Sequence, residues 1–392
     1  MNPPPTIAWL ATGSEHYGIG RAIIQLASSL KHSGWNVLIL ATVEGALTEA
    51  AREAGIECLV LGVGRPPPAS SRRKRFLYLL RARGYSRRLI ASAHRVLGDR
   101  RVDVVQVLVP SLVPIAGHLA ASLNAVCVWE MSNVVRSGRF ISVPRLFHQI
   151  ECTRWHIHPL SNSRYTAATL GTWPVRARVC ELGVDPDRFD PSRVKALTRA
   201  EAGLPDDAIV LGIFGRLDPR KGHQVTLRAI HALGDRASNV HLYAPGAGMS
   251  GQDKIEIRET ARSLGLESRL HLPGPTAEPE NHLPLIDIAV NCYLGAEAFG
   301  LSVVEAMMMR KPCLVHALGG PGETVLDGVT GWHVDRPTPE AMSAGLARAL
   351  DDRDRWEAMG AAGRERAIEH YSVQAHLDRY RGHIQDILSA RR

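Results

Sequence analysis

The sequence predicts an α/β protein with two doubly wound, Rossmann-like domains. Short, nearly continuous Val/Ile/Leu runs alternate with amphipathic stretches, this pattern restarts near the middle, and 392 residues exceed one ordinary domain. Strands that are apolar throughout are typical of parallel sheets covered by helices on both faces. The composition, 45% hydrophobic and 22% charged, excludes a largely disordered chain.

The first half contains five expected strands and four expected helices. The strands are Thr6–Ala11, Asn36–Ala41, Ile56–Gly62, Asp103–Val109 and Ala125–Glu130. The helices are Gly20–Lys31, Leu47–Ala54, Phe76–Leu97 with a break at Gly84, and Pro114–Leu123.

The second half repeats the alternation. The expected strands are Ala208–Phe214, Asn239–Ala244, Arg269–Leu272, Ile286–Asn291, Pro312–His316 and Gly331–Val334. The expected helices are Gly222–Leu233, Lys254–Leu264, Leu301–Met309, Glu340–Leu350 and Arg355–His370. The junction is expected in the proline-containing, charged stretch Asp185–Glu201, which gives domains at 1–188 and 189–372.

The positive charge is concentrated in one segment. The chain has a net charge of +8, yet residues 65–101 contain twelve Lys or Arg and one acid. The densest part is a run of four cations, Arg72, Arg73, Lys74 and Arg75. This basic amphipathic stretch, which runs to residue 97, suits an anionic membrane surface or acceptor, and equally a solvated helix face. Nucleic acid is disfavoured, because aromatic side chains do not alternate with the charges.

The sequence predicts neither a signal peptide nor a membrane-spanning helix. Residues 1–5 carry no basic group, and the longest apolar stretch, 102–128, is interrupted by polar residues and prolines. The six cysteines form no C-x-x-C pair, which favours reduced thiols. We expect a cytoplasmic chain whose membrane contact, if any, is peripheral and on the inner face of the membrane.

A glycine loop follows the first expected strand. Gly18 and Gly20 stand where the first helix opens, and glycine lets backbone N–H groups approach an anion closely. Ile23 replaces the third glycine of a dinucleotide fingerprint, which disfavours a nicotinamide dehydrogenase. A purely structural turn is the alternative.

A cationic loop follows the first strand of the second half. Arg216 and Lys221 are five residues apart across a turn, so both can face one anion. A diphosphate fits this pair, because arginine offers a forked donor and lysine a point charge. A charged surface loop is the alternative.

Two acids flank a later helix start. Glu297 lies in a loop, Gly300 loosens the turn, and Glu305 lies on the first turns of the helix that begins at Leu301. Backbone N–H groups there point toward an anion, and the carboxylates can bind hydroxyl groups on either side of it. Two acids at this spacing also arise by chance.

Together these segments resemble the retaining, nucleotide-sugar-dependent glycosyltransferases of family four (group 1), which have the two-domain GT-B architecture. The matching motifs are Gly18-Ile19-Gly20-Arg21, Glu181-Leu182-Gly183-Val184-Asp185, Gly215-Arg216-Leu217 with Lys221-Gly222, Leu272-Pro273-Gly274, Glu297-Ala298-Phe299-Gly300-Leu301 with Glu305-Ala306-Met307, and Gly319-Gly320. The resemblance implies an acceptor-side first domain and a donor-binding second domain facing it across a cleft. It also implies a C-terminal helix, 373–392, that returns to the first domain.

The resemblance implies roles for the charged residues. Arg216 and Lys221 would hold the donor diphosphate and stabilise it as it leaves. Glu297 would bind hydroxyls of the donor sugar, and Glu305 would bind the ribose. Members of the family need no metal and no cofactor besides the nucleotide sugar.

Backbone positions complete the implied donor site. The amides that would cap the distal phosphate belong to Ala298, Phe299, Gly300 and Leu301. The backbone of Gly274 and Pro275 would face the base, and Gly18 and Gly20 would line the opposite side of the cleft.

The chain departs from the family pattern at two positions. Glu130 follows the fifth expected strand where many members carry a histidine, and Gln106 replaces another. Glu130 is a candidate catalytic residue, as a ligand of a sugar hydroxyl or a base near the acceptor; an ordinary strand-end carboxylate is the alternative. Asn133 and Arg136, in the following loop, are candidate acceptor contacts.

The predicted function is retaining transfer of a hexose-type sugar from a UDP- or GDP-sugar to a hydroxyl acceptor. The acceptor would be a glycan, a lipid-linked molecule or a small molecule, in the synthesis of cell-surface polysaccharide or glycolipid. The alternatives on this fold are a nucleotide-sugar hydrolase or epimerase, and a non-catalytic nucleotide-sugar-binding module. The presence of Arg216, Lys221 and Glu297 disfavours the last of these.

Overall fold

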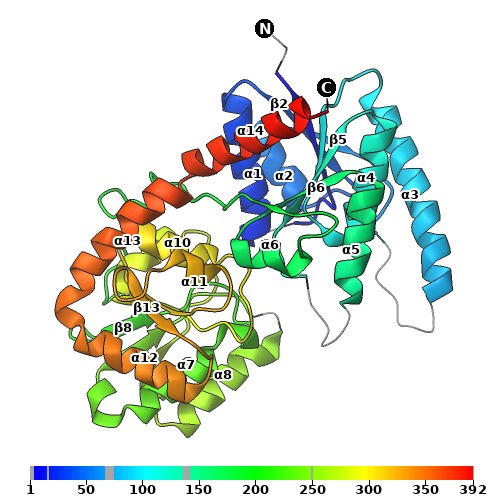
Figure 1. Cartoon of the computed structure of the whole chain (residues 1–392). Helices are drawn as coiled ribbons and strands as arrows, with labels where there is room; N and C mark the ends of the chain where they lie inside the picture. Colours follow the sequence, from blue (N-terminus) through cyan, green and yellow to red (C-terminus); the bar gives the residue numbers. More distant parts are fainter. Residues whose placement is uncertain (1–3, 16, 67–74, 136–141, 249, 392) are drawn as a thin grey trace. The chain divides into compact units, whose positions relative to one another are not determined.

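The computed structural model describes residues 4–15, 17–66, 75–135, 142–248 and 250–391, and its elements are labelled in Figure 1. The chain divides into two compact units. Unit 1 comprises residues 1–180 and 376–392, and unit 2 comprises residues 181–375. The division lies between Cys180 and Glu181, whereas the sequence placed it after residue 188.

Unit 1 is built on a parallel sheet. Its described strands are β1 (Thr6–Ala11), β2 (Asn36–Ala41), β3 (Glu57–Val60), β4 (Val104–Val107), β5 (Val126–Met131), β6 (Ile157–Ser161) and β7 (Arg178–Val179). Its helices are α1 (Tyr17–His32), α2 (Ala46–Glu53), α3 (Arg75–Leu97), α4 (Val113–Ser122), α5 (Val143–Arg154), α6 (Arg164–Leu170) and α14 (Val373–Ser389). The strand order is β3-β2-β1-β4-β5-β6-β7, so the winding reverses between β1 and β4.

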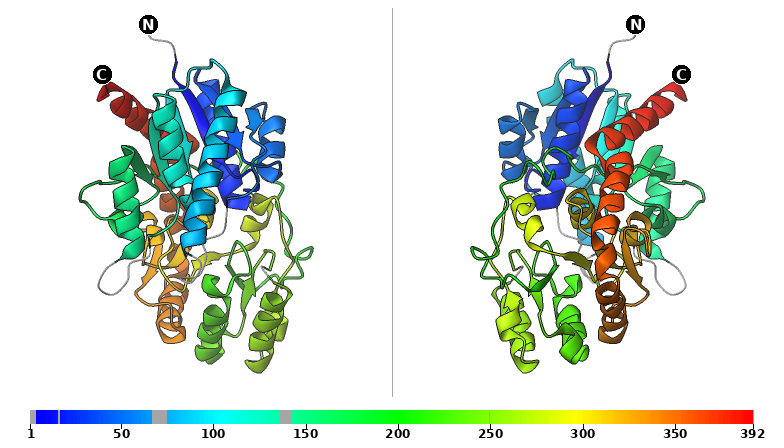
Figure 2. Two further views of the ribbon diagram at one scale, coloured as in Figure 1. Left: turned by 90° about the vertical axis from the view of Figure 1, so that its right-hand side faces the viewer. Right: turned by 90° about the vertical axis from the view of Figure 1, so that its left-hand side faces the viewer.

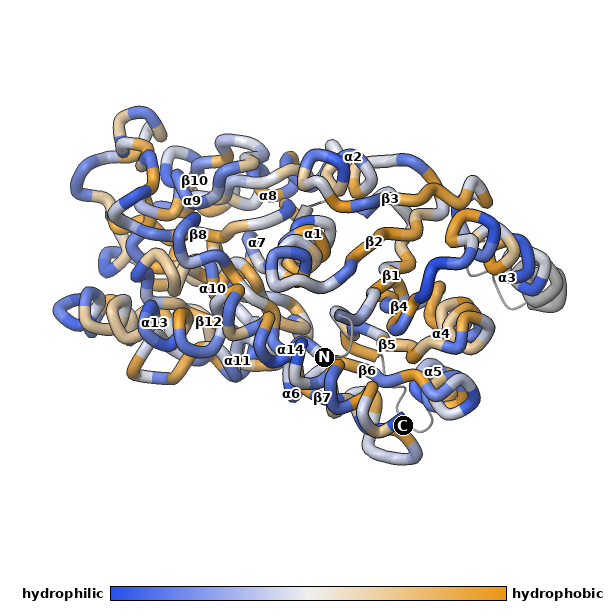
Figure 3. The backbone as a smooth tube through the Cα atoms, turned by 90° about the horizontal axis from the view of Figure 1, so that it is seen from above, coloured by the Kyte–Doolittle hydropathy of each residue, from blue (hydrophilic) through white to orange (hydrophobic). Residues whose placement is uncertain are grey.

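The strands of unit 1 are buried on both faces. Along β1, Ala8 and Leu10 enter one apolar cluster, while Ile7, Trp9 and Ala11 enter another. Successive side chains of a strand point to opposite faces, so each face needs its own cover of helices. Figure 3 shows the resulting apolar strands, and Figure 2 shows the helices on either side of the sheet.

The C-terminal helix α14 completes the second of these clusters. Its Tyr380 stacks on Trp9 with ring centroids 6.4 Å apart, and Leu377, Ile384 and Ile387 join the same cluster. The β1 face of unit 1 is therefore closed by residues from the far end of the sequence.

Unit 2 contains a second parallel sheet. Its described strands are β8 (Ile209–Gly212), β9 (Val240–Tyr243), β10 (Leu270–His271), β11 (Ile288–Asn291), β12 (Cys313–His316) and β13 (Gly331–Val334). Its helices are α7 (His223–Ala232), α8 (Gly251–Ser263), α9 (Pro279–His282), α10 (Leu301–Met308), α11 (Gly320–Thr324), α12 (Pro339–Asp351) and α13 (Trp356–Tyr371). The order β10-β9-β8-β11-β12-β13 makes β8 and β11 neighbours at the point where the winding reverses.

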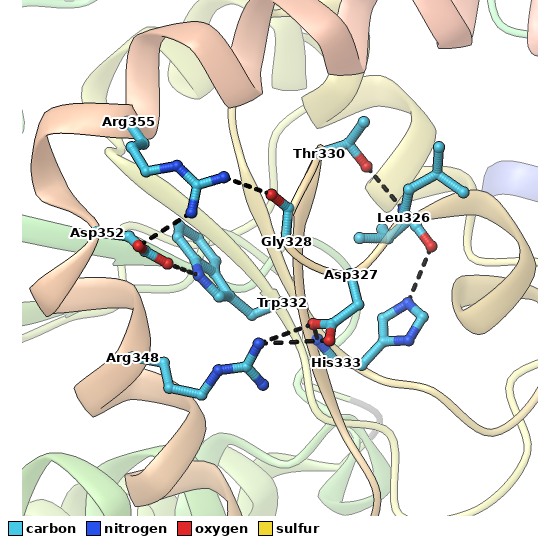
Figure 4. Close-up of polar contacts among 10 residues, drawn as sticks. Leu326, Asp327, Gly328, Thr330, Trp332, His333, Arg348, Asp352 and Arg355 are labelled. Atoms are coloured by element: carbon cyan, nitrogen blue, oxygen red, sulfur yellow. Dashed lines mark hydrogen bonds and ion pairs between the residues drawn. The ribbon is translucent and has the colours of Figure 1, made fainter.

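A polar network fixes the edge strand β13 to the helices behind it (Figure 4). Asp327 accepts hydrogen bonds from the backbone of His333 at 2.8 Å and from Arg348 at 3.2 Å. The indole N–H of Trp332 donates to Asp352 at 2.8 Å, and Arg355 donates to the carbonyl of Gly328. Asp327 and Gly328 therefore hold the turn before β13 in place.

Gly84 interrupts the apolar spacing of the predicted helix 76–97, but it does not interrupt the helix itself. Helix α3 runs without interruption through this residue, which meets no neighbouring atom within 4 Å at its Cβ position. A single exposed glycine costs a helix only about 1 kcal/mol. Tyr85, Leu89 and Ala93 are buried on the same helix, and their packing outweighs that cost.

Candidate functional site

The candidate site of unit 2 lies at the carboxyl ends of β8 and β11. The loop after β8 holds Arg216 and Lys221, and the loop after β11 holds Glu297. Ligands of doubly wound sheets bind outside these strand ends, where the winding reverses. The topology thus brings to one edge of one sheet two motifs that are about 75 residues apart in sequence.

Lys221 and Glu297 form an ion pair at this edge. The ammonium nitrogen lies 2.8 Å from the carboxylate, and the two side chains are 19% and 18% exposed. The same nitrogen lies 5.3 Å from the centroid of the Tyr293 ring, a cation–π distance. A small part of each charged group therefore remains open to a ligand, and each is oriented by the other.

The loop that carries Arg216 is held by a buried carboxylate. Asp218 accepts hydrogen bonds from the backbone of Arg220 at 2.9 Å and from its guanidinium, and these bonds lower the pKa of Asp218. Arg216 lies 4.0 Å from Asp218 and is 49% exposed, so its charge stays available. The sequence analysis missed Asp218, although an aspartate directly before Pro219 is a typical N-cap for the short helix Pro219–Lys221.

Three glycines connect the loops after β8, β9 and β10. A side chain at Gly246 would place its Cβ 1.9 Å from the carbonyl oxygen of Gly215, and the Gly246 N–H donates to the carbonyl of Gly274 at 2.8 Å. Only glycine fits such an approach. Gly274 and the exposed Pro275 are thereby tied to the loop that carries Arg216.

Helix α10 begins beside Glu297. Gly300 is its N-cap with φ 86°, so the first-turn N–H groups at Leu301 point out of the helix end. The backbone carbonyl of Glu297 accepts from the N–H of Gly320 at 2.9 Å, which fixes the loop before the helix. Phe299 is 4% exposed and packs against Tyr371, so it offers a ligand only its backbone, as does Ala298 by its small size.

Glu305 lies one turn into α10 and is half-buried. The structure therefore gathers Arg216, Lys221, Glu297 and the α10 N-terminus on one sheet edge, with Glu305 on the adjoining helix. This arrangement offers two cations and a helix N-terminus to an anion, and two carboxylates to hydroxyl groups.

In unit 1 an acidic side chain, Glu15, closes the turn between β1 and α1. The carboxylate of Glu15 accepts the N–H groups of Thr12 and Gly13 at 2.7 and 2.8 Å. Gly18 and Gly20 lie in the first turns of α1, and a Cβ at Gly20 would come within 2.8 Å of the Glu15 carbonyl. The sequence analysis missed Glu15, which lies two residues before α1.

Glu130 is held by a hydrogen-bonded chain that reaches α14. Gln106 is the register partner of Trp9 and Val128, so its side chain points to the face of the sheet that α14 covers. Its amide donates to the Glu130 carboxylate at 2.8 Å, and its carbonyl accepts from the hydroxyl of Tyr380. Burial raises the pKa of Glu130 to about 7, and the bond from Gln106 opposes this rise.

Of the other residues predicted for the acceptor or the membrane, the structure describes only Asn133 and Arg75. Asn133 is exposed and donates to the hydroxyl of Ser132 at 3.2 Å. Arg75 is the first residue of α3. The residues that lie outside the described part of the chain are Arg72, Arg73, Lys74 and Arg136.

The described residues provide neither a cluster of metal ligands nor a membrane-spanning helix. No three His, Cys, Asp or Glu side chains in that part of the chain gather to hold a metal ion. None of the helices described is both long and apolar enough to cross a membrane.

Part of the chain is similar in sequence to known glycosyltransferases. Residues 194–366 match the model of the family described as Glycosyl transferases group 1. A D-inositol 3-phosphate glycosyltransferase of Kineococcus radiotolerans is 33% identical over 238 residues, which cover 55% of this chain and 54% of that protein. A GDP-mannose-dependent alpha-(1-6)-phosphatidylinositol monomannoside mannosyltransferase of Mycolicibacterium smegmatis is 33% identical over 219 residues, covering 54% and 55%.

Solved structures share the fold over nearly the whole chain. A glycosyltransferase from Rickettsia africae aligns with a TM-score of 0.81 and 19% identity, covering 99% of both chains. Anabaena HepE, solved in complex with UDP and glucose, aligns with a TM-score of 0.79 and 17% identity, covering 97% of this chain and 99% of that one. The predicted fold class, two Rossmann-like units of the GT-B type, is confirmed.

The match to the glycosyl transferases group 1 family model lies entirely within unit 2. The chain spans about half the length of the curated relatives it matches. All of the unit 2 site from Arg216 to Glu305 lies within the matched residues.

Proposed function

We propose that the chain is a retaining glycosyltransferase that transfers a hexose-type sugar from a UDP- or GDP-sugar to a hydroxyl acceptor. The observation that carries the proposal is the Lys221–Glu297 pair beside Arg216 and the N-terminus of α10, at the edge where the winding of the sheet reverses. Cations and helix N–H groups suit a diphosphate, and the carboxylates suit the hydroxyls of a sugar and a ribose.

These residues have separate tasks in the proposed reaction. As the bond from the sugar to the diphosphate breaks, negative charge grows on the leaving phosphate, and Arg216 and Lys221 lie where they would stabilise it. One such preorganised donor contributes about 3 kcal/mol to a transition state. The ammonium of Lys221 would exchange Glu297 for phosphate, which releases the carboxylate to bind a sugar hydroxyl. Because these groups supply the charge, we propose that no metal takes part.

For the acceptor and the location of the enzyme, we propose a class rather than a particular molecule or compartment. The acceptor is a hydroxyl of a glycan, a lipid-linked molecule or a small molecule, and one relative is named for its action on phosphatidylinositol monomannoside. The basic segment 72–97 supports peripheral contact with an anionic membrane. Cell-surface polysaccharide or glycolipid synthesis is the setting that fits both features.

Thermal-shift measurements with UDP, GDP, ADP and their sugars, without added metal, test the donor site. A ligand that binds only the folded protein raises the Tm, so one nucleotide class should raise it clearly. Relatives are named for GDP-mannose and UDP, so both bases are tested. No shift with any nucleotide or sugar contradicts the proposal. Donor cleavage that is equally fast with and without acceptors would favour the hydrolase alternative.

A further inference from the structure

Helix α5 exposes a row of large apolar side chains. Val143, Leu146, Phe147 and Ile150 are between 47% and 58% exposed. Their spacing of three, one and three residues places them on one face of the helix. We call these four residues the α5 stripe. The other large exposed apolar side chains in the described part of the chain are spread over several elements.

The stripe is not needed to hold α5 in place. The helix packs through its other side against α4, β6 and α6, and Figure 1 shows it at the edge of the helices of unit 1. There Gln149 is buried and donates to the carbonyls of Leu170 and Val175 at 2.9 and 2.8 Å, and Cys152 is fully buried. The exposed apolar face therefore requires an explanation other than core packing.

The surface around the stripe is basic. Residues 142–180 contain five arginines and a single acid, Glu151, which accepts a hydrogen bond from Trp155. Arg154 is exposed and follows Ile150 by one helical turn, whereas the guanidinium of Arg145 lies against Gly171, away from the stripe. Apolar side chains flanked by cations match the boundary between acyl chains and anionic head groups.

An exposed tryptophan accompanies the stripe. The loop 171–175 is fastened to α5 through Gln149, whose side-chain oxygen also accepts from the N–H of Val175 at 2.9 Å. Trp173 in this loop is 82% exposed. Tryptophan is the residue that most favours the level of lipid head groups, since its ring is apolar and its N–H is polar.

We propose that the α5 stripe docks unit 1 onto an anionic lipid bilayer. Leu146 and Phe147 enter the interface, while Arg154 meets a lipid phosphate. The stripe extends about 12 Å along the helix, which suits a helix lying in the interface plane. The inference depends on the proposed function in one respect only. If the chain is a glycosyltransferase, docking on the bilayer would bring a lipid-linked acceptor to unit 1.

A second copy of the chain fits this surface less well. A two-fold symmetric dimer through the stripe would bring Arg154 of both copies into the interface, with Glu151 as the sole acid on the helix. Like charges facing each other across an interface cost several kcal/mol. An anionic bilayer supplies the opposite charge, so the lipid surface is the occupant that the charges favour.

Vesicle flotation without nucleotide tests the proposal. The full chain should float with vesicles made of equal parts of phosphatidylcholine and phosphatidylglycerol, and not with phosphatidylcholine alone. The double variant Leu146→Ser/Phe147→Ser should lower the partition coefficient at least about tenfold, since each buried apolar side chain contributes about that factor. Arg154→Gln should lower the partition coefficient as well and reduce its dependence on salt.

Matched controls separate the stripe from general surface change. Ile255→Ser/Ile368→Ser removes two large side chains that are 48% and 41% exposed in unit 2, and should float like the wild type. Circular dichroism checks that each variant is folded. Flotation of the folded stripe variant at the wild-type level would overturn the proposal. So would a wild-type dimer that becomes monomeric in that variant and never binds vesicles.

The nucleotide thermal shift keeps the two proposals distinguishable. Flotation lost in the stripe variant, with an unchanged shift, supports the membrane surface and leaves the donor site intact. If the wild type floats with vesicles but no nucleotide raises its Tm, the membrane-docking proposal is supported. Only the glycosyltransferase proposal is then contradicted.

Discussion

The side-chain amide of Gln106 lies 2.8 Å from the carboxylate of Glu130, on neighbouring strands of unit 1. Gln106 is fully buried, and its other amide atom accepts from Tyr380. Both hydrogen-bonding ends of the glutamine are thus committed, so its amide can be oriented in one way only. Glu130 consequently has a fixed donor, although its burial disfavours the charged form.

Glu130→Gln should make the stability of the protein less dependent on pH. The pKa of Glu130 is about 7 in the folded state and 4.5 ordinarily, so folding takes up a proton between these values. The stability of the wild type therefore falls as pH rises through this window. The variant should be more stable than the wild type by about 1–3 kcal/mol near pH 8, and by much less near pH 5. Urea unfolding at both pH values measures this, and an equal difference at both would contradict it.

Gln106→Leu should raise the pKa of Glu130 further, because it removes a bond that stabilises the carboxylate. Tyr380→Phe keeps the glutamine and should shift the pKa less, while leaving an acceptor unsatisfied at a cost of about 1–3 kcal/mol. NMR titration of labelled glutamate carboxyl carbons, with Glu130→Gln to assign the signal, reads the pKa directly. An unchanged titration in Gln106→Leu would remove Gln106 from this role.

Lys221→Ala should lower the rate of sugar transfer about a hundredfold or more, because the leaving diphosphate loses a preorganised cation. Lys254→Ala removes an exposed lysine of α8 in the same unit and serves as the matched control. Initial rates of nucleotide release with acceptor present provide the measurement. A wild-type rate in a folded Lys221→Ala protein would refute the diphosphate assignment.

Gly246→Ala should weaken nucleotide binding about tenfold or more. Its new Cβ would collide with the carbonyl of Gly215 at 1.9 Å and displace the loop that carries Arg216. Gly251→Ala adds the same atom where nothing lies within 4 Å, and should bind as the wild type does. Calorimetric titration with the nucleotide that raises the Tm compares the two. Equal affinity in both variants would show that the glycine contact does not set the loop.

The elements with a strong apolar period were predictable from the sequence. Strands β1, β2 and β13 begin and end where the patterns predicted. Helix α5 was missed, because its apolar stripe faces outward and its buried face includes the polar Gln149. Strand β7 was missed because two residues carry no recognisable period.

The site was predictable in its residue types but not in its contacts. The cations and acids were recognised through their motifs, and their gathering follows from the strand order, which no local pattern reveals. Tyr293 acts by packing against Lys221, so only the folded chain identifies it, whereas Asp218 before Pro219 carried an N-cap signal that the sequence analysis did not use. Glu15 was missed because its partners are backbone N–H groups, which every residue but proline carries.

Helix α14 comes from the end of the sequence, and this position affects the order in which the two units can fold during translation. Trp9 and its neighbours leave the ribosome early, but Tyr380, Ile384 and Ile387, which cover them, follow only after all of unit 2. Until then a nascent unit 1 exposes an apolar sheet face of the kind that chaperones bind. A chain ended at residue 372 should accordingly show unit 1 digested by protease and unit 2 preserved. Protection of both would mean that α14 is dispensable for unit 1.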